Sequence, residues 1–307
     1  MLICLYAPMN KGLLLVFSTA IISGFSVFIN KFGVGISNPN IFAFAKNVVV
    51  AIFFTAIVLL FRDRKSLFQL KKKQWAQLVI LGLIGGSIPF LLFFKGLAMT
   101  SAIQGAFIHK TMFIFVAILA AITLKEKINK NFLIGGLLLL LGNLILLKSF
   151  AFSFGLGDGL ILLAVLFWTA ENVLAKYVLR EISGNIVAWG RMFFGAIFIL
   201  GYLTLIGQSS QLLSLDLVQI KWIAITAALL FGYTLTWYNG LKTVPVSVAT
   251  TILLFALPIT ATLTALSTGK ANFENIFSGL LIITGLIVIL GMRKFEAKAI
   301  IAKSLDH

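Results

Sequence analysis

His109 and Lys110 stand next to each other inside a long apolar run that extends from Ala102 to Leu124. As a helix, this run is long enough to cross a hydrocarbon core of roughly 30 Å. A Lys near the centre of such a helix costs roughly 2.5 to 3.5 kcal/mol on insertion scales, so it normally faces a bundle interior or a water-filled cavity. We therefore predict that Lys110 contacts a substrate or takes part in coupling. The alternatives are that it snorkels to the membrane interface or forms a structural pair with Glu171.

His109 has two readings in the same helix. An imidazole changes its charge near neutral pH, which suits a proton relay. A neutral ring that packs between helices is the alternative, and the sequence leaves both open.

Another apolar run carries Trp168, Glu171 and Asn172 on one helical face, because positions i, i+3 and i+4 project to the same side. Glu171 is the one acidic residue deep inside any apolar run. Its carboxylate can bind a substrate amine, carry a coupling proton, or neutralise Lys110 or Lys176 as a structural partner. We expect this face to line a binding site.

The composition indicates what kind of protein must position these side chains. Of 307 residues, 60% are hydrophobic and only 11% are charged, and the mean hydropathy is +1.08. Such values lie far outside the soluble globular range and predict a membrane protein with several spans. The 29 Phe are interpreted as lipid-facing and packing bulk.

Several other classes of function are disfavoured. The formal charge of +16 comes mostly from short loops between apolar runs, so it indicates topology and no nucleic-acid partner. Cys4 is the single cysteine, which excludes an internal disulfide and a thiolate metal cluster. The sequence has no Walker loop and no metal-binding spacing of His and carboxylates, so we expect no cofactor and no ATP-driven step.

Ten apolar segments can be marked, which predicts an all-α membrane protein with ten transmembrane helices. The first exceeds the 7–15 residues of a signal-peptide core and is interpreted as a span, although Met9 also looks like an ordinary start. The segments are 12–32, 41–61, 75–97, 102–124, 132–148, 156–178, 186–206, 219–240, 246–268 and 276–292.

Lys and Arg residues predict the orientation of these spans. If the N-terminus is cytoplasmic, the inner loops hold most of the basic residues, including six in 62–73, and the tail is basic. The outer loops then hold only Lys148, Lys221 and Lys270. The positive-inside rule therefore places both termini in the cytoplasm, and we expect a multi-pass protein of the inner (plasma) membrane.

The sequence also contains an internal repeat. An offset of 145 residues places 40–47 over 185–192 and Lys31 over Lys176, and an offset of 144 pairs 95–97 with 239–241. We therefore predict two five-helix repeats, 1–150 and 151–307. Because five is odd, the second repeat is inverted relative to the first. Inverted repeats place a substrate site near the midplane, and alternating access arises by rocking around it.

The offset pairs candidate site residues between the repeats. Ser26 is the equivalent of Glu171, so the face formed by Ser23, Ser26 and Asn30 is expected to line the opposite wall. Lys46 and Arg191 are also equivalent. A structural role for this basic pair near helix ends is favoured over substrate contact.

Lys95 and Asn239 form a further pair. With Trp237 and Tyr238 they are candidates for a polar and aromatic rim of the site. The alternative is that the aromatic residues belong to the interfacial belt that Trp and Tyr form near span ends.

These features resemble the EamA-type, ten-span branch of the drug/metabolite transporter superfamily. The resemblance covers nearly the whole chain: a basic residue early in the second span of each half, Gly-Leu before a short turn, a small-residue-rich fourth span and a Gly-rich fifth. The family Glu after span four appears as Glu126, whereas Thr268-Gly269-Lys270 replaces its second-half equivalent. The span-four Pro is present only as Pro258, with Ile114 at the first-half position.

A narrower likeness concerns the fourth span. Phosphate translocators of the plastid type carry a His and a Lys shortly before the family Pro, and Lys110 falls on that phosphate-contacting Lys. Those translocators also use basic residues in span nine, where this sequence has 250–253, Thr-Thr-Ile-Leu. The likeness implies an anionic solute and leaves its identity open.

The resemblance implies a secondary transporter, and no enzyme. We expect it to export a small polar metabolite, such as an amino acid or a related zwitterion or anion, because buried cations need a negative partner. An exchanger of phosphate-bearing or organic-acid metabolites is the alternative. A membrane-embedded enzyme acting on lipid phosphates is the more distant rival. Expected partners are the solute and membrane lipid, and the protein is expected to be a monomer or a weak homodimer.

Overall fold

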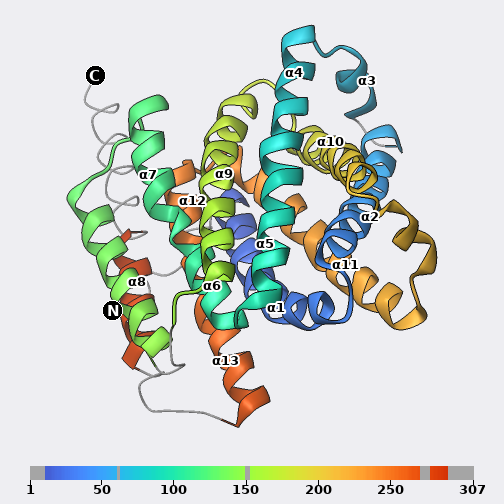
Figure 1. Ribbon diagram of the computed structural model, residues 1–307. Coiled ribbons are helices and arrows are strands. Elements are labelled where there is room, and N and C mark those ends of the chain that lie inside the picture. Colours follow the sequence, from blue (N-terminus) through green and yellow to red (C-terminus); the bar gives the residue numbers. More distant parts are fainter. Residues whose placement is uncertain (1–10, 61–62, 149–152, 270–276, 290–307) are drawn as a thin grey trace, which may run out of the picture.

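The computed structural model describes residues 11–60, 63–148, 153–269 and 277–289, and within these ranges the chain is helical with no strand (Figure 1). Cys4 and the basic tail lie outside the described residues. The helices are α1 (Lys11–Ile36), α2 (Pro39–Leu60), α3 (Asp63–Phe68), α4 (Lys72–Leu81), η2 (Gly82–Ser87), α5 (Ile88–Met99), α6 (Ala102–Lys110), α7 (Met112–Thr123), α8 (Lys130–Lys148), α9 (Leu156–Val178), α10 (Gly184–Leu205), η3 (Ser209–Ser214), α11 (Leu217–Leu241), α12 (Val246–Ile252), η4 (Leu253–Phe255), α13 (Ala256–Thr268) and the helix Phe277–Ile289.

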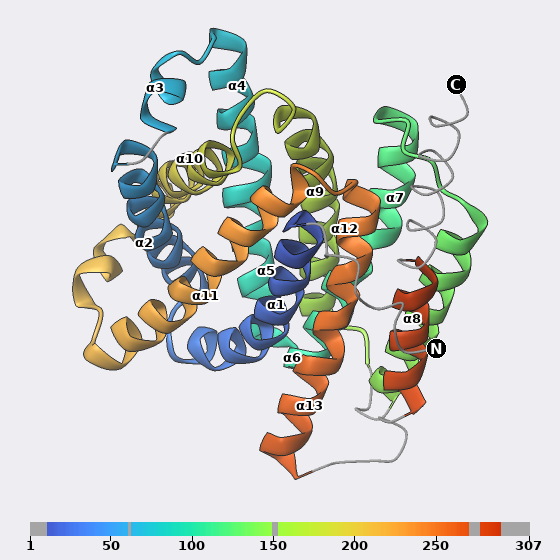
Figure 2. The same ribbon diagram turned by 180° about the vertical axis from the view of Figure 1, so that it is seen from behind.

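Eight helices in the described chain are long and apolar enough to cross a membrane, which makes this a multi-pass membrane protein. Two shorter apolar helices, Lys130–Ile145 and Phe277–Ile289, fall where the fifth and tenth spans were expected. They lie side by side at one edge of the molecule (Figures 1 and 2), and the Ser278 hydroxyl donates to the Gly142 carbonyl oxygen at 2.6 Å.

The third span contains a π-helical turn, η2, between α4 and α5. A π turn leaves carbonyl groups without their usual helical partners. Here the Trp168 Nε1 donates to the Gly85 carbonyl oxygen at 3.0 Å, and the Asn47 amide donates to that of Gly86 at 2.5 Å. A methyl group on Gly86 would collide with the backbone of Arg191, so glycine is what lets α10 lie against this turn.

The fourth span of each half is interrupted at an equivalent position, which is a correction to the expected unbroken helices. The first breaks at Thr111, between α6 and α7, and the second at η4, between α12 and α13. The Thr111 amide contacts both the Phe107 and the Ile108 carbonyl oxygens, at 3.2 and 3.1 Å, so its hydrogen bond is shared. Apolar composition alone predicts a continuous helix, and it carries no signal for such a break.

The side chain of Glu126 caps the second of these spans. Its carboxylate accepts hydrogen bonds from the backbone amides of Val246 and Ser247, at 2.9 and 3.1 Å, and from the Ser247 hydroxyl. A carboxylate at the N-terminus of a helix satisfies free amides and complements the helix dipole. The Glu of the first half therefore supports α12 of the second half.

Two hydrogen bonds between the halves repeat each other across the molecule. The Asn40 amide donates to Gln208 Oε1 at 3.1 Å, and the Asn185 amide donates to Asp63 Oδ2 at 2.8 Å. Both members of one pair lie 145 positions from their counterparts in the other. We call these two contacts the end clasps, because they join the start of α2 to the segment after α10 and the start of α10 to the segment after α2.

Candidate solute-binding cavity

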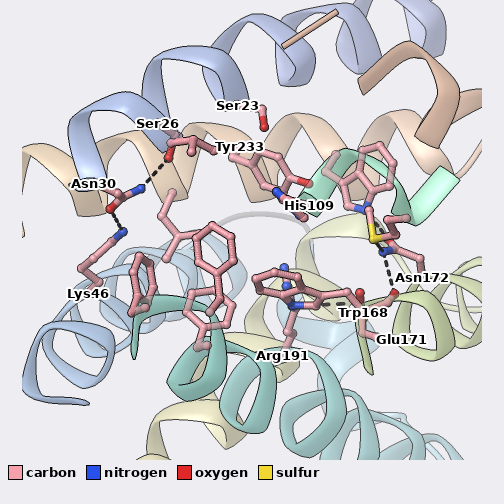
Figure 3. Close-up of a pocket in the computed structure, with 17 residues that line it drawn as sticks. Ser23, Ser26, Asn30, Lys46, His109, Trp168, Glu171, Asn172, Arg191 and Tyr233 are labelled. Carbon is pink, nitrogen blue, oxygen red and sulfur yellow. Dashed lines mark hydrogen bonds and ion pairs between the residues drawn. The ribbon is translucent and has the colours of Figure 1, made fainter. Parts of the chain in front are cut away.

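A cavity of about 70 Å³ lies between the halves, where first-half helices α1, α2, α5, α6 and α7 face second-half helices α9, α10 and α11 (Figure 3). The residues that line it are Ser23, Ser26, Val27, Asn30, Lys46, Phe90, Phe93, Phe94, His109, Met112, Trp168, Glu171, Asn172, Arg191, Leu230, Tyr233 and Trp237.

Lys46 is the cation on the first-half side of the cavity, and its side chain is 1% exposed. Its ammonium group donates to Asn30 Oδ1, and the Asn30 amide in turn donates to Ser26 Oγ at 2.9 Å. The ammonium also lies over the rings of Phe42 and Phe94, 4.9 and 4.4 Å from their centroids. No carboxylate of the described chain pairs with Lys46, so neutral groups alone stabilise its charge.

Arg191 is the cation on the second-half side, and there a carboxylate is present. Arg191 Nε lies 4.0 Å from Glu171 Oε1, and the Tyr238 hydroxyl donates to that oxygen at 2.5 Å. The guanidinium also lies over the rings of Phe90 and Tyr238, at 5.4 and 5.8 Å. Arg191 Nε is buried without a hydrogen-bond acceptor in the described chain, so this ion pair leaves one donor unsatisfied.

His109 lies against an aromatic wall of the cavity. Its ring centroid is 5.3 Å from that of Phe93 and 4.9 Å from that of Trp168. Its Nδ1 is buried and has no hydrogen-bond partner among the described residues. Because buried polar atoms are almost always paired, this nitrogen is available to a ligand group or to water.

Lys110 lies beside the cavity and does not line it. Its ammonium donates to Ser23 Oγ at 2.7 Å, and Ser23 is itself a lining residue. The expected structural pairing of Lys110 with Glu171 is wrong, because the carboxylate lies next to Arg191. The sequence interpretation named Lys110 and Lys176 as partners of Glu171 and did not name Arg191, because the sequence gives no distances between helices.

Some of the other candidate residues belong to the cavity or contact its lining, and the rest lie away from it. Asn172 lines the cavity, and its Oδ1 accepts from the Trp237 indole at 2.8 Å, so this face of α9 does point inward. Tyr238 does not line the cavity, and it contacts the site through its hydrogen bond to Glu171 and through its ring next to Arg191.

Three candidates lie away from the cavity. The Asn239 amide donates to Asn185 Oδ1 at 3.0 Å, and Lys95 is exposed on α5. Lys176 donates to the Leu241 carbonyl oxygen at 2.7 Å, at the end of α11.

The sequence interpretation missed the aromatic wall. Phe90, Phe93 and Phe94 are 3 to 4% exposed and line the cavity, which corrects the view that the Phe residues only face lipid or fill space. Their spacing of i, i+3 and i+4 on one helical face was the available signal. Tyr233 was missed as well, because a Tyr in a span also suits the membrane interface.

Comparisons with known proteins agree with this architecture. The model of the EamA-like transporter family matches the chain twice, at residues 10–148 and 155–291. The uncharacterized transporter YyaM of Bacillus subtilis is 27% identical over 289 residues, which cover 88% of this chain and 92% of that protein. An uncharacterized transporter of Methanothermobacter thermautotrophicus is 25% identical over 157 residues, about half of each chain, at 49% and 46%.

One solved crystal structure shares the fold, with a TM-score of 0.72 at 19% identity, covering 93% of this chain and 98% of that one. Two successive matches to one family model account for the equivalence of Lys46 with Arg191 and of the two interrupted fourth spans. The chain belongs to the EamA-like transporter family, within the drug/metabolite transporter superfamily.

Proposed function

We propose that this protein is a secondary transporter of a small solute that carries a negative charge, such as an amino acid or a related zwitterion or anion. The observation that carries the proposal is that the two cations of the cavity lack a full set of negative or acceptor partners in the described chain. Lys46 has no acidic partner in the described chain, and Arg191 Nε has no hydrogen-bond acceptor there. Buried cations and donors without partners are costly, so a solute with acceptor oxygens would be stabilised between them.

We further propose that transport proceeds by alternating access. Nearly all residues that line the cavity are buried, so binding and release require the helices to move. The lining comes from both halves, and relative motion of the halves would change its size and exposure. Glu171 and His109 are the proposed carriers of a coupling proton, because both are titratable and line the cavity.

The proposal includes the topology predicted from the sequence. It consists of ten spans in two inverted five-helix repeats, 1–150 and 151–307, in the inner membrane with both termini in the cytoplasm. A cavity enclosed by helices of one chain supports function as a monomer. The proposed direction, export, rests on the resemblance to the family.

Exchange of phosphate-bearing solutes is less well supported. A phosphate monoester carries up to two negative charges and three acceptor oxygens. The positions of the second repeat that are equivalent to Lys110, 143 and 144 residues later, are the apolar residues Leu253 and Leu254. Lys110 itself is held by Ser23 outside the lining.

Counterflow in proteoliposomes tests the function. Vesicles loaded with an unlabelled amino acid, organic acid or sugar phosphate should accumulate the labelled compound only if it is a substrate. We expect uptake of amino acids or organic acids, with loss in Lys46→Met and no change in Lys95→Met. An imposed pH gradient should drive net flux in the wild type, whereas Glu171→Gln or His109→Gln should retain exchange and lose that drive. Absence of flux for every compound would contradict the proposal.

A further inference from the structure

The two cations of the cavity have equivalent surroundings in the two halves. Lys46 and Arg191 are 145 positions apart, and each lies over a ring, Phe94 or Tyr238, that is 144 positions from the other. The distances to the ring centroids are 4.4 Å for Lys46 and 5.8 Å for Arg191. The basic residue and its ring therefore form one arrangement that occurs twice.

The third member of this arrangement differs between the halves. In the second half, Glu171 supplies a carboxylate that lies 4.0 Å from the guanidinium. The equivalent position in the first half, 145 residues earlier, is Ser26, which carries no charge. The Asn30 side chain joins Ser26 to Lys46 by two hydrogen bonds. Its amide oxygen accepts a hydrogen bond from the ammonium but, being neutral, does not balance the positive charge.

We propose that the carboxylate of the solute binds beside Lys46 and Ser26, in the place that Glu171 fills in the second half. This inference rests on the proposed transport function and names the chemical class of solute. The Lys46 ammonium keeps two N–H groups for a ligand, because an ammonium has three donors and Asn30 accepts from one of them. The Ser26 hydroxyl is a further donor on the same wall of the cavity.

A single carboxylate fits this subsite better than a dianion. The arrangement of the second half shows one carboxylate held by one cation, one aromatic ring and one hydroxyl, that of Tyr238. The first half offers the same set in Lys46, Phe94 and Ser26, and no second cation among the described residues bonds to the site.

The remainder of the solute would extend towards the aromatic wall. Figure 3 shows Lys46, Asn30 and Ser26 at one side of the cavity, and Trp168, Glu171 and Arg191 away from them. Because Glu171 already accepts from Tyr238 and lies next to Arg191, a solute amine is not needed to satisfy it. The carboxylate is thus the required group and the amine an optional one.

The test measures binding by isothermal titration calorimetry on the purified full-length protein. Three matched probes separate the groups: L-leucine, its deaminated form 4-methylpentanoate, and its decarboxylated form 3-methylbutylamine. A second set consists of L-phenylalanine, 3-phenylpropionate and 2-phenylethylamine. We expect the amino acid and the carboxylate of at least one set to bind, and both amines to fail. Tighter binding of the amines, or binding of no probe, would overturn the proposal.

Variants place the carboxylate at the subsite. Lys46→Met removes the cation, and Ser26→Glu supplies a built-in acid that mimics the second half. Each should weaken carboxylate binding about 10- to 100-fold, the loss expected for a charged hydrogen bond. Lys95→Met, the same change at an exposed position, should bind like the wild type.

The double variant Ser26→Glu with Glu171→Ser exchanges these two residues between the halves. It should regain carboxylate binding, with the carboxylate now next to Arg191. If Ser26→Glu does not fold, as judged by size-exclusion chromatography, Ser26→Asp and Lys46→Gln take its place.

Failure of this inference can be told apart from failure of the transport function. If the wild type shows counterflow but Lys46→Met and Ser26→Glu bind carboxylates normally, the subsite is wrong and transport stands. If carboxylate binding is lost in both variants but the wild type shows no flux in vesicles, the subsite stands and the transport proposal is wrong.

Discussion

Lys31 and Lys176, which are 145 positions apart, form the same contact at equivalent helix ends. Lys31 donates to the Leu97 and Ala98 carbonyl oxygens near the end of α5, at 2.9 and 3.1 Å. Lys176 donates to the Leu241 and Val244 carbonyl oxygens at the end of α11, at 2.7 and 2.8 Å. A cation at a helix C-terminus satisfies free carbonyl groups and complements the helix dipole, so each Lys fastens a helix of its own half.

Lys31→Met and Lys176→Met should each destabilise the protein by about 1.5 to 3 kcal/mol, the usual worth of hydrogen bonds to a charged donor. The two sites share no partner, so the double variant should lose about the sum of the single losses. Thermal unfolding of the detergent-solubilised protein, followed by tryptophan fluorescence, measures this. Lys95→Met serves as the control, and single variants that melt like the wild type would contradict the capping role.

The end clasps predict that α2 and α10 stay together during transport. The same two helices are joined at both ends in one conformation, so we expect the other helices to move around the α2/α10 pair without separating it. In a background with Cys4→Ser, Cys pairs at Asn40 with Gln208 and at Asp63 with Asn185 can be joined by short bifunctional reagents. The protein should keep its counterflow activity whichever of the two ends is cross-linked. Block of flux by one cross-link and not by the other would show that this clasp opens as a gate.

Gly86 should tolerate no side chain. Its added methyl group would meet the Arg191 carbonyl group, and a fixed backbone cannot move aside as a flexible side chain can. Gly86→Ala should therefore cost about 1 to 3 kcal/mol, as overpacking typically does, and should lower activity because Arg191 is displaced. The matched control is Gly201→Ala on α10, where nothing lies within 4 Å. There, alanine should be neutral or stabilising by up to about 1 kcal/mol.

Glu171 and Arg191 should depend on each other for stability. Removing one partner of a buried ion pair leaves a charge without compensation, which typically costs about 3 to 5 kcal/mol. Glu171→Gln and Arg191→Met should each lower the melting temperature, and the double variant should recover part of the loss. The coupling free energy from this double-mutant cycle is the measurement. Strict additivity of the two single effects would mean that the separation of 4.0 Å carries no interaction.

The helical membrane architecture could be predicted from the sequence because length and apolarity fix which segments can span a bilayer. The repeat could also be predicted, since a constant offset of 145 aligns Lys31 with Lys176 and Lys46 with Arg191. The π turn at 82–87 and the breaks in the fourth spans were not predicted. They arise from contacts with other helices, such as that of Trp168 with Gly85, and no local pattern reports such contacts.

The candidate cavity was predictable to a similar degree. Intramembrane polar residues such as Glu171 and Ser26 marked the inward faces of their helices, because such groups avoid lipid. The position of Arg191 next to Glu171 was not predicted, because the choice among Lys110, Lys176 and Arg191 depends on how the helices pack. The Phe residues of α5 were missed because an apolar ring suits lipid and the cavity wall equally well.

The end clasps also set an order for making the protein. Asn40 and Gln208 are 168 positions apart, and Asp63 and Asn185 are 122 apart. At a synthesis rate of about 5 to 20 residues per second, Asn40 waits roughly 8 to 34 s for its partner. The first spans must therefore reside in the membrane with polar side chains unmatched, and the clasp of Asp63 with Asn185 can close first. The two halves therefore fold in sequence, and the first half completes its hydrogen bonds only after the second half has entered the membrane.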